Sequence, residues 1–177
     1  MKATGIVRRI DDLGRVVIPK EIRRTMRIRE GDPLEIYTSA GGEVIFKKYS
    51  PIGEMAAFAA EYAESLSNAT RLPVLICDRD HCIAAAGISK KEVLERRITP
   101  YIESLMEERR SVTPDTGEEY QALEGIDRTV RVAVPILNAG DVSGAVVFIA
   151  DETGSKADAS DLKLANVAAD FLGRQVE

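Results

Sequence analysis

The repeat of apolar residues changes at Ser50-Pro51, and this change most limits how the chain can fold. Before it, short alternating segments between turn residues indicate β-strands, whereas after it apolar residues recur every three or four positions, as in a helix. We therefore expect separate structural units on the two sides. We assign residues 1–50 to a first domain, residues 51–70 to a connecting helix that also serves in dimerisation, and residues 71–177 to a second domain that includes the C-terminal helix.

The first domain is expected to contain two hairpins around one short helix. In order, the elements are strand 5–10, turn 11–14, strand 15–18, helix 20–26 after Pro19, strand 34–38, turn 40–42 and strand 43–47. A ββαββ unit of this size is too small to bury enough apolar surface alone without a disulfide or a metal. We therefore expect two copies to share strands in an obligate dimer.

Charge is divided unevenly along the chain. The whole sequence has a formal net charge of −5, yet residues 1–50 hold eleven Lys or Arg and seven Asp or Glu, a net charge of +4. The remaining 127 residues carry −9, and the first 29 residues alone carry +6. This division indicates a polyanionic partner for the basic segment only, because the acidic segment would repel nucleic acid. A solvated basic face without a partner is the alternative.

Two segments have the apolar spacing of a short coiled coil, with steps of 3, 4, 3 and 4 residues. They are Ile52, Met55, Ala59, Tyr62 and Leu66, and Leu162, Ala165, Ala169, Leu172 and Val176. Two such helices could pair across a two-fold axis as a bundle, which we favour. The alternative is that both helices lie on the sheet of their own chain.

The second domain alternates hairpins with helices, which indicates an antiparallel sheet covered by helices and thus an α+β fold. The expected elements are strands 72–77 and 82–86, helix 90–97, a helix from Thr99-Pro100 to about Arg110, a loop at 111–124, and strands 129–136 and 143–149. Ser89 and Glu92 have the spacing of a capping box for helix 90–97.

The sequence gives little support for catalysis or metal binding. Cys77, His81 and Cys82 are close in sequence, but a structural zinc site needs four ligands and the chain has no other Cys or His. We interpret Cys77 as a core residue on a strand, and we expect no cofactor and no enzyme activity. Two cysteines, the lack of a signal peptide and the lack of an apolar run of ~18 residues favour the cytoplasm and argue against a membrane partner.

The segment from Thr4 to Pro19, TGIVRRIDDLGRVVIP, followed by Glu21-Ile22-Arg23-Arg24, resembles the AbrB-type transition-state regulators. This resemblance runs from residue 2 to about residue 49. It implies a swapped-hairpin dimer that binds double-stranded DNA. It also implies that the DNA contacts come from Arg8, Arg15, Arg23 and Arg24, with Lys2 and Arg9 as secondary candidates. Guanidinium groups suit both phosphate oxygens and guanine edges.

Residues 56–177 resemble a GAF sensor domain in the order of their elements and in the pattern Val134-Pro135-Ile136, Gly140, Gly144 and Val147. This resemblance implies a small-molecule effector, as yet unidentified, between the sheet and residues 100–128. Together, the two resemblances imply a cytoplasmic homodimer or homotetramer. Its function would be to activate some late sporulation genes and repress others.

Two other functions remain open. Swapped-hairpin domains also occur in antitoxins, which neutralise a toxin through a disordered tail, whereas residues 51–177 have the pattern of a folded domain. Some GAF proteins reduce free methionine sulfoxide with active-site cysteines. That activity here would depend on Cys77 and Cys82, the two cysteines of the chain.

Overall fold

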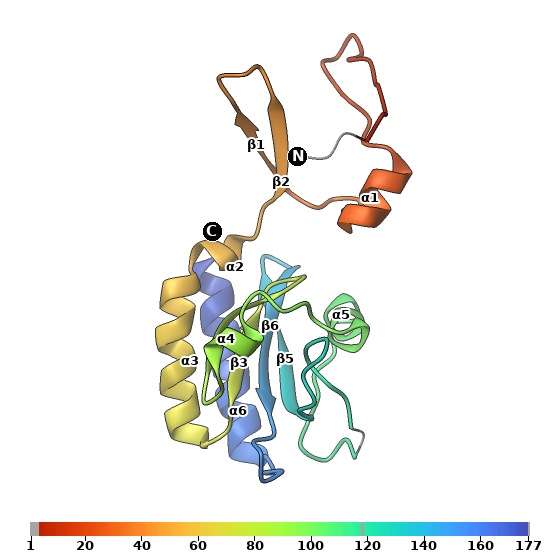
Figure 1. Ribbon diagram of the computed structural model, residues 1–177. Helices are drawn as coiled ribbons and strands as arrows, with labels where there is room; N and C mark the ends of the chain where they lie inside the picture. The colour runs from red at the N-terminus through yellow and green to blue at the C-terminus, as the bar shows by residue number, and fades with distance from the viewer. Residues whose placement is uncertain (1–3, 118, 177) are drawn as a thin grey trace. The chain divides into compact units, whose positions relative to one another are not determined.

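The computed structural model describes residues 4–117 and 119–176 (Figure 1). The chain divides into two compact units, an N-terminal unit, Met1–Tyr49, and a C-terminal unit, Ser50–Glu177. Helices and strands occur in both, so the molecule has the predicted α+β character.

The N-terminal unit contains helix α1 (Lys20–Met26) and a hairpin of strands β1 (Leu34–Thr38) and β2 (Val44–Lys48). The strands pair antiparallel, with Ile36 opposite Phe46. The prediction of this helix and this hairpin is confirmed, with the second strand displaced by one residue. Gly42 closes the hairpin turn with a φ of +83°, a conformation that glycine adopts without a steric cost.

The prediction of strands at 5–10 and 15–18 is wrong for the single chain, where neither segment is a β-strand. The turn between them does form, since the Gly14 N–H donates to the Asp11 carbonyl at 3.0 Å and Gly14 has a φ of +76°. The Asp11 N–H also donates to the Arg15 carbonyl at 3.0 Å. A β-strand is defined by its backbone hydrogen bonds to a neighbouring strand. Alternation of side chains does not indicate whether that neighbour belongs to the same chain or to another.

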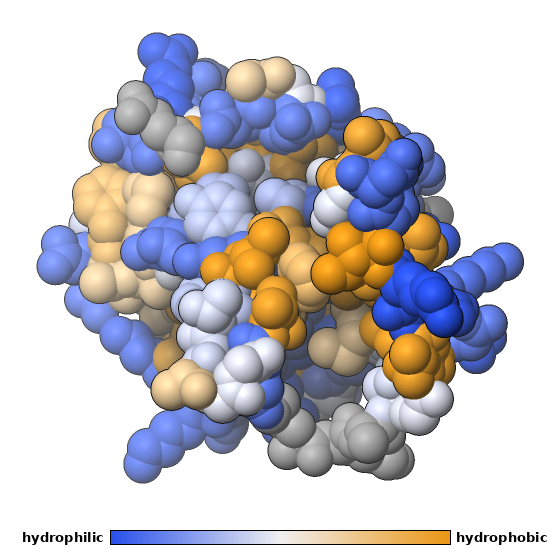
Figure 2. Space-filling model, turned by 90° about the horizontal axis from the view of Figure 1, so that it is seen from above, coloured by the Kyte–Doolittle hydropathy of each residue, from blue (hydrophilic) through white to orange (hydrophobic). Residues whose placement is uncertain are grey.

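The N-terminal unit has almost no interior as a single chain. Among its described residues, 4–49, only Pro19 is buried. Large apolar side chains are exposed instead, and Figure 2 shows such side chains at the surface among hydrophilic ones. The most exposed are Val7 (85%), Val17 (71%), Leu13 (70%) and Ile10 (69%). These side chains lie on both sides of the Gly14 turn, in the two segments that form no β-ladder within the described part of the chain.

The C-terminal unit is built on a four-stranded antiparallel sheet in the order β4-β3-β6-β5. Its strands are β3 (Val74–Cys77), β4 (Cys82–Ala86), β5 (Val130–Asn138) and β6 (Asp141–Ile149). Both predicted hairpins are confirmed, and pairing of β3 with β6 joins them into one sheet. Strands β4 and β5 are therefore the two edge strands of the sheet.

One face of this sheet is covered by helices α3 (Ala56–Thr70) and α6 (Ala159–Gln175), and the short α2 (Pro51–Glu54) precedes α3. The first core lies between them and contains Val74, Ile76 and Phe148 from the strands. The spacing that predicted two coiled-coil seams belongs to this core, because its residues are buried or half-buried against the sheet. The coiled-coil interpretation is wrong, since any amphipathic helix on a sheet has the same period.

The opposite face of the sheet packs against helices α4 (Lys90–Val93) and α5 (Pro100–Glu107) and forms the second core. The predicted helix 90–97 ends at Val93, and Ser89 makes no side-chain cap. The chain turns there because Glu95 has a φ of +61° and the Cys82 N–H donates to the Arg96 carbonyl at 2.9 Å. Residues after α4 thus run beside β4 instead of continuing the helix.

Candidate nucleic-acid interface

The arginines predicted to contact DNA all lie in the N-terminal unit and are exposed. Arg8 and Arg15 lie on the two arms of the loop around Gly14, and Arg9 lies beside Arg8. Arg23 and Arg24 are in the last turn of α1. Lys2, the remaining candidate, lies outside the described residues.

The Arg15 side chain is oriented by Asp11. Arg15 Nε donates to Asp11 Oδ2 at 2.8 Å, and the Arg15 backbone N–H donates to Asp11 Oδ1 at 2.7 Å. The Leu13 N–H donates to the same Oδ1 at 3.0 Å. These bonds, first the backbone N–H of Arg15 and then its side chain, lower the pKa of the Asp11 carboxyl. The Arg15 side chain nevertheless remains 69% exposed.

The C-terminal end of α1 is capped by backbone hydrogen bonds, which fix the backbone that carries Arg23 and Arg24. The Arg23 carbonyl accepts from the Ile28 N–H at 2.8 Å, and Arg27 takes a left-handed conformation with a φ of 50°. Lys48 Nζ, on β2, donates to the Arg27 carbonyl at 2.8 Å. Positive charge in the last turn also complements the helix dipole, so these arginines have a structural role as well.

Lys47 adds a cation that sequence reasoning counted but did not single out. Its Nζ lies 4.6 Å from the centre of the Tyr37 ring, which comes from the neighbouring strand β1. A cation over an aromatic face at this distance is stabilised by the ring quadrupole. The contact holds Lys47 on the hairpin surface. In the sequence, the only sign of this role is that Lys47 occupies an alternate, exposed position of a predicted strand.

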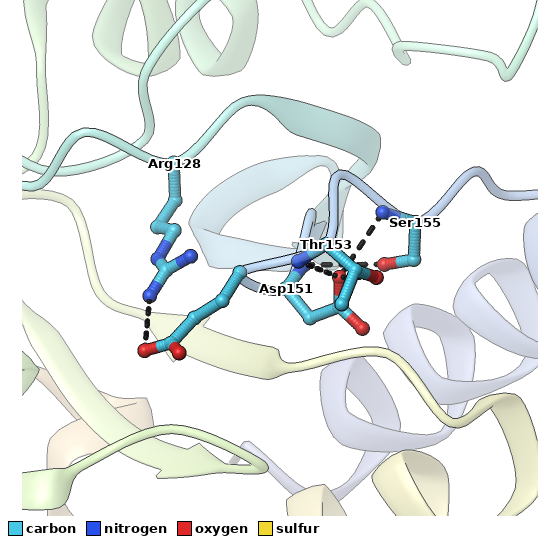
Figure 3. A network of polar contacts seen from close by, with 5 residues as sticks. Arg128, Asp151, Thr153 and Ser155 are labelled. Atoms are coloured by element: carbon cyan, nitrogen blue, oxygen red, sulfur yellow. Dashed lines mark hydrogen bonds and ion pairs between the residues drawn. The ribbon is translucent and has the colours of Figure 1, made fainter.

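The C-terminal unit contains an open cavity of about 410 Å³. It is lined by Pro73, Gly87, Ile88, Ser89, Glu92, Arg128, Asp151 and Glu152. Arg128 Nη2 lies 3.0 Å from Glu152 Oε1, and the Asp151 carboxylate accepts bonds from Thr153 and Ser155 (Figure 3). The wall thus presents one guanidinium among several carboxylates. Sequence reasoning did not single out this cavity, because its lining comes from four separate segments.

The region where the sequence predicted an effector is occupied by side chains of the second core. Leu75 and Val147 from the sheet are buried there, as are Ile102 and Leu105 from α5 and Leu123 from the following loop. The cavity described above lies instead at residues that follow or precede strand ends.

The two cysteines are buried and lie opposite each other on β3 and β4. Hydrogen bonding with Cys82, together with burial, raises the pKa of the Cys77 thiol well above its ordinary value. Since the thiolate is the nucleophilic form, this environment disfavours cysteine chemistry. Within the described residues, no group of three or more His, Cys, Asp and Glu could hold a metal ion. No helix in that part of the chain is both long and apolar enough to cross a membrane.

Two family descriptions match the sequence, and they divide it near the boundary between the units. Residues 54–177 match "Stage V sporulation protein T C-terminal, transcription factor". Residues 7–53 match "Antidote-toxin recognition MazE, bacterial antitoxin".

Two relatives come from Bacillus subtilis (strain 168). Stage V sporulation protein T is 53% identical over 180 residues, which cover 100% of this chain and 99% of that protein. Transition state regulatory protein AbrB is 61% identical over 51 residues, which cover 29% of this chain and 52% of that protein. The first relative therefore matches both units, and the second matches the N-terminal unit.

Solved structures that resemble this chain include GAF-type folds. The GAF domain from Acinetobacter phosphoenolpyruvate-protein phosphotransferase has a TM-score of 0.54 at 11% identity, covering 71% of this chain and 87% of its own. A type II free methionine-R-sulfoxide reductase from Thermoplasma acidophilum also has a TM-score of 0.54, at 15% identity, covering 71% of this chain and 94% of its own. At these identities the likeness confirms a GAF-like fold and carries no activity.

Proposed function

Because the chain belongs to the stage V sporulation protein T family, we propose that it is a DNA-binding transcription regulator of sporulation whose N-terminal unit binds double-stranded DNA. Activation of some late genes and repression of others is part of the proposal, as is action in the cytoplasm. The observation that carries it is the set of exposed arginines, Arg8, Arg15, Arg23 and Arg24, on a unit 61% identical to that of AbrB.

Dimerisation of the N-terminal unit is supported by its exposed apolar side chains. Val7, Val17 and Ile10 are more than two-thirds exposed in the single chain, and the segments that hold them pair with no strand among the described residues. A second copy would bury these side chains and complete the ladders, as in a swapped hairpin. Folding and pairing would then be one event.

A second self-association surface lies on the outer side of α3 and α6. Phe58, Tyr62 and Phe171 form an aromatic cluster, with ring centroids 5.4–6.3 Å apart, and Phe58 and Phe171 are about 40% exposed. Val167, 61% exposed, belongs to the same helix as Phe171. Pairing at this surface with a different copy from the one bound at the N-terminal unit would produce a homotetramer.

Regulation by a small molecule is the finer part of the proposal. The cavity lined by Arg128, Asp151 and Glu152 offers both signs of charge, and its position among strand ends supports a polar effector. Helix α2 begins at Pro51, so the core that contains Ile52 is close in sequence to the N-terminal unit. An effector would regulate DNA binding only if it favoured one arrangement of the assembly over another.

The direct test is DNA affinity across a salt series for wild type and for Arg8→Ala/Arg15→Ala. A dimer offers eight of the main arginines, and if all contact phosphates, log K against log[salt] should have a slope of about −7. The double variant removes four of them, so we expect weaker binding and a slope near half that value.

Arg109→Ala/Arg110→Ala is the matched control, because it removes the same charge from exposed positions in the C-terminal unit. Its binding should remain close to that of wild type. A flat salt dependence in wild type, or equal losses in the two double variants, would contradict DNA binding through the N-terminal unit.

An antitoxin function is the second candidate, and the match of residues 7–53 to a bacterial antitoxin family favours it. Such a function would need a segment that orders on a toxin partner. The described residues after Ser50 instead form a sheet with two cores. Limited proteolysis separates the two functions, since a stable fragment of residues 50–177 argues against a disordered toxin-binding tail.

A further inference from the structure

Asp11 places a negative charge within the most basic part of the chain. Its carboxylate accepts two backbone N–H groups through Oδ1, at 2.7 and 3.0 Å, and the Nε of Arg15 through Oδ2, at 2.8 Å. All three donors lie within four residues, so this arrangement is local to the loop and needs no second copy. The carboxylate therefore holds both the loop backbone and one edge of the guanidinium.

We propose that Asp11 is a positioning residue for DNA binding, which fixes the Arg15 guanidinium by its Nε edge and leaves its Nη groups to face the DNA. The proposal rests on the proposed function of this unit. A guanidinium is planar, so a bond to Nε sets the plane and direction of the remaining donors. A side chain that is 69% exposed would otherwise lose rotamer freedom on binding, and this loss lowers affinity.

Simple electrostatics predicts the opposite effect of Asp11. A carboxylate near a phosphate backbone repels it, so removal of the charge should strengthen binding. Positioning predicts that removal weakens binding. The sign of the change therefore distinguishes the two roles without depending on its size.

The neighbouring Asp12 provides a matched control. It is exposed, has the same charge and lies in the same turn, but it accepts none of the three bonds that Asp11 accepts. Asp11→Asn keeps an oxygen that can accept the backbone bonds of the loop while it removes the charge that faces Nε. The pair Asp11→Asn and Asp12→Asn thus changes net charge equally and differs in contact with Arg15.

The experiment measures affinity of the full-length chain for one A·T-rich duplex in wild type, in both Asn variants, in Arg15→Ala and in Asp11→Asn/Arg15→Ala. We expect Asp11→Asn to weaken binding by about 2- to 25-fold, since an exposed ion pair contributes about 1.4- to 5-fold and a dimer has two. Asp12→Asn should bind as tightly as wild type or more tightly. In the Arg15→Ala background, Asp11→Asn should cause no further loss.

Three results would overturn the proposal. Binding of Asp11→Asn equal to or tighter than that of wild type would assign Asp11 to repulsion alone. An equal loss with and without Arg15 would show that Asp11 acts on the loop as a whole. If wild type and Asp12→Asn do not bind DNA either, the proposed function fails, and this inference fails with it.

Discussion

At the residue scale, three aspartates of this protein organise local backbone by accepting backbone N–H groups. Asp11 does so before the loop that carries Arg15, and Asp151 does so after β6, where Thr153 and Ser155 donate to it. Asp158 accepts from Ser160 and Asp161 and forms a capping box for α6. In each case the carboxylate stabilises a local backbone conformation through short-range bonds.

The Asp151 carboxyl should remain ionised in moderately acidic solution. The Thr153 hydroxyl and then the Ser155 N–H lower its pKa from 3.8 to about 2. Because the pKa is lower in the folded state, the ionised form stabilises the fold above pH 3.8, and this contribution is lost as the pH falls through about 2. Titration of the carboxyl ¹³C shift by NMR measures this pKa.

A matched pair of variants tests whether ionised Asp151 contributes to the free energy of unfolding. Asp151→Asn should flatten the dependence of unfolding free energy on pH between about 4 and 2. Glu152→Gln is the charge control, because it removes a carboxylate from an 88% exposed neighbour that accepts none of the Thr153 and Ser155 bonds. A folded-state pKa near 3.8 for Asp151 would contradict the hydrogen bonds that Thr153 and Ser155 donate to its carboxylate.

At the element scale, the C-terminal unit follows the period-two rule closely. Along β3 and β6, Val74, Ile76 and Phe148 belong to one core, whereas Leu75 and Val147 belong to the other. Helix α6 lies close to the sheet because Gly173 faces the Leu137 carbonyl of β5. A Cβ at this position would overlap that carbonyl oxygen, so the glycine sets the separation between helix and sheet.

Gly173→Ala should destabilise the C-terminal unit by about 1–3 kcal/mol, because overpacking forces the helix away from a backbone atom that cannot rotate aside. Helix propensity alone predicts the reverse, since alanine is favoured over glycine by about 1 kcal/mol within a helix. Chemical denaturation gives the free energy of unfolding. Lys163→Ala, at an exposed position on α6, is the control and should change it by less than about 0.5 kcal/mol. A stabilised Gly173→Ala variant would contradict the close contact.

Sequence patterns predicted the elements whose partners lie nearby in the chain. Both hairpins of the C-terminal unit, α1, and the hairpin of β1 and β2 follow from alternation and turn residues. Helix 90–97 was overestimated, because the pairing of Arg96 with Cys82 is a tertiary contact that local propensity does not contain. The bond of Asp11 to Arg15 was missed for a related reason, since Asp11 and Asp12 are chemically identical and only the loop conformation distinguishes them.

At the scale of the whole molecule, two units of different kinds are joined in one chain. The C-terminal unit has a sheet with a core on each face, whereas the described part of the N-terminal unit buries Pro19 alone. The predicted strands at 5–10 and 15–18 were wrong for one chain, because alternation of side chains does not identify a pairing partner, within the chain or outside it. The first unit is therefore the one for which we propose that stability depends on association.

The isolated N-terminal unit should unfold with a midpoint that rises with protein concentration. For a dimer that dissociates as it unfolds, each tenfold increase in concentration adds about 1.4 kcal/mol to apparent stability. Circular dichroism during chemical denaturation at several concentrations measures this dependence. A fixed midpoint would mean that a single copy folds alone, and the exposed Val7 and Val17 would then need another explanation.

The exposed apolar side chains around the Gly14 turn also affect how DNA binding depends on the amount of this protein in the cell. If two chains must meet before either N-terminal unit is complete, the concentration of the DNA-binding form rises as the square of the chain concentration when chains are scarce. Doubling the gene dose would then raise promoter occupancy up to fourfold. Once most chains are paired, the DNA-binding form rises only in proportion to the chain concentration, so the regulated genes would respond most steeply while chains are scarce.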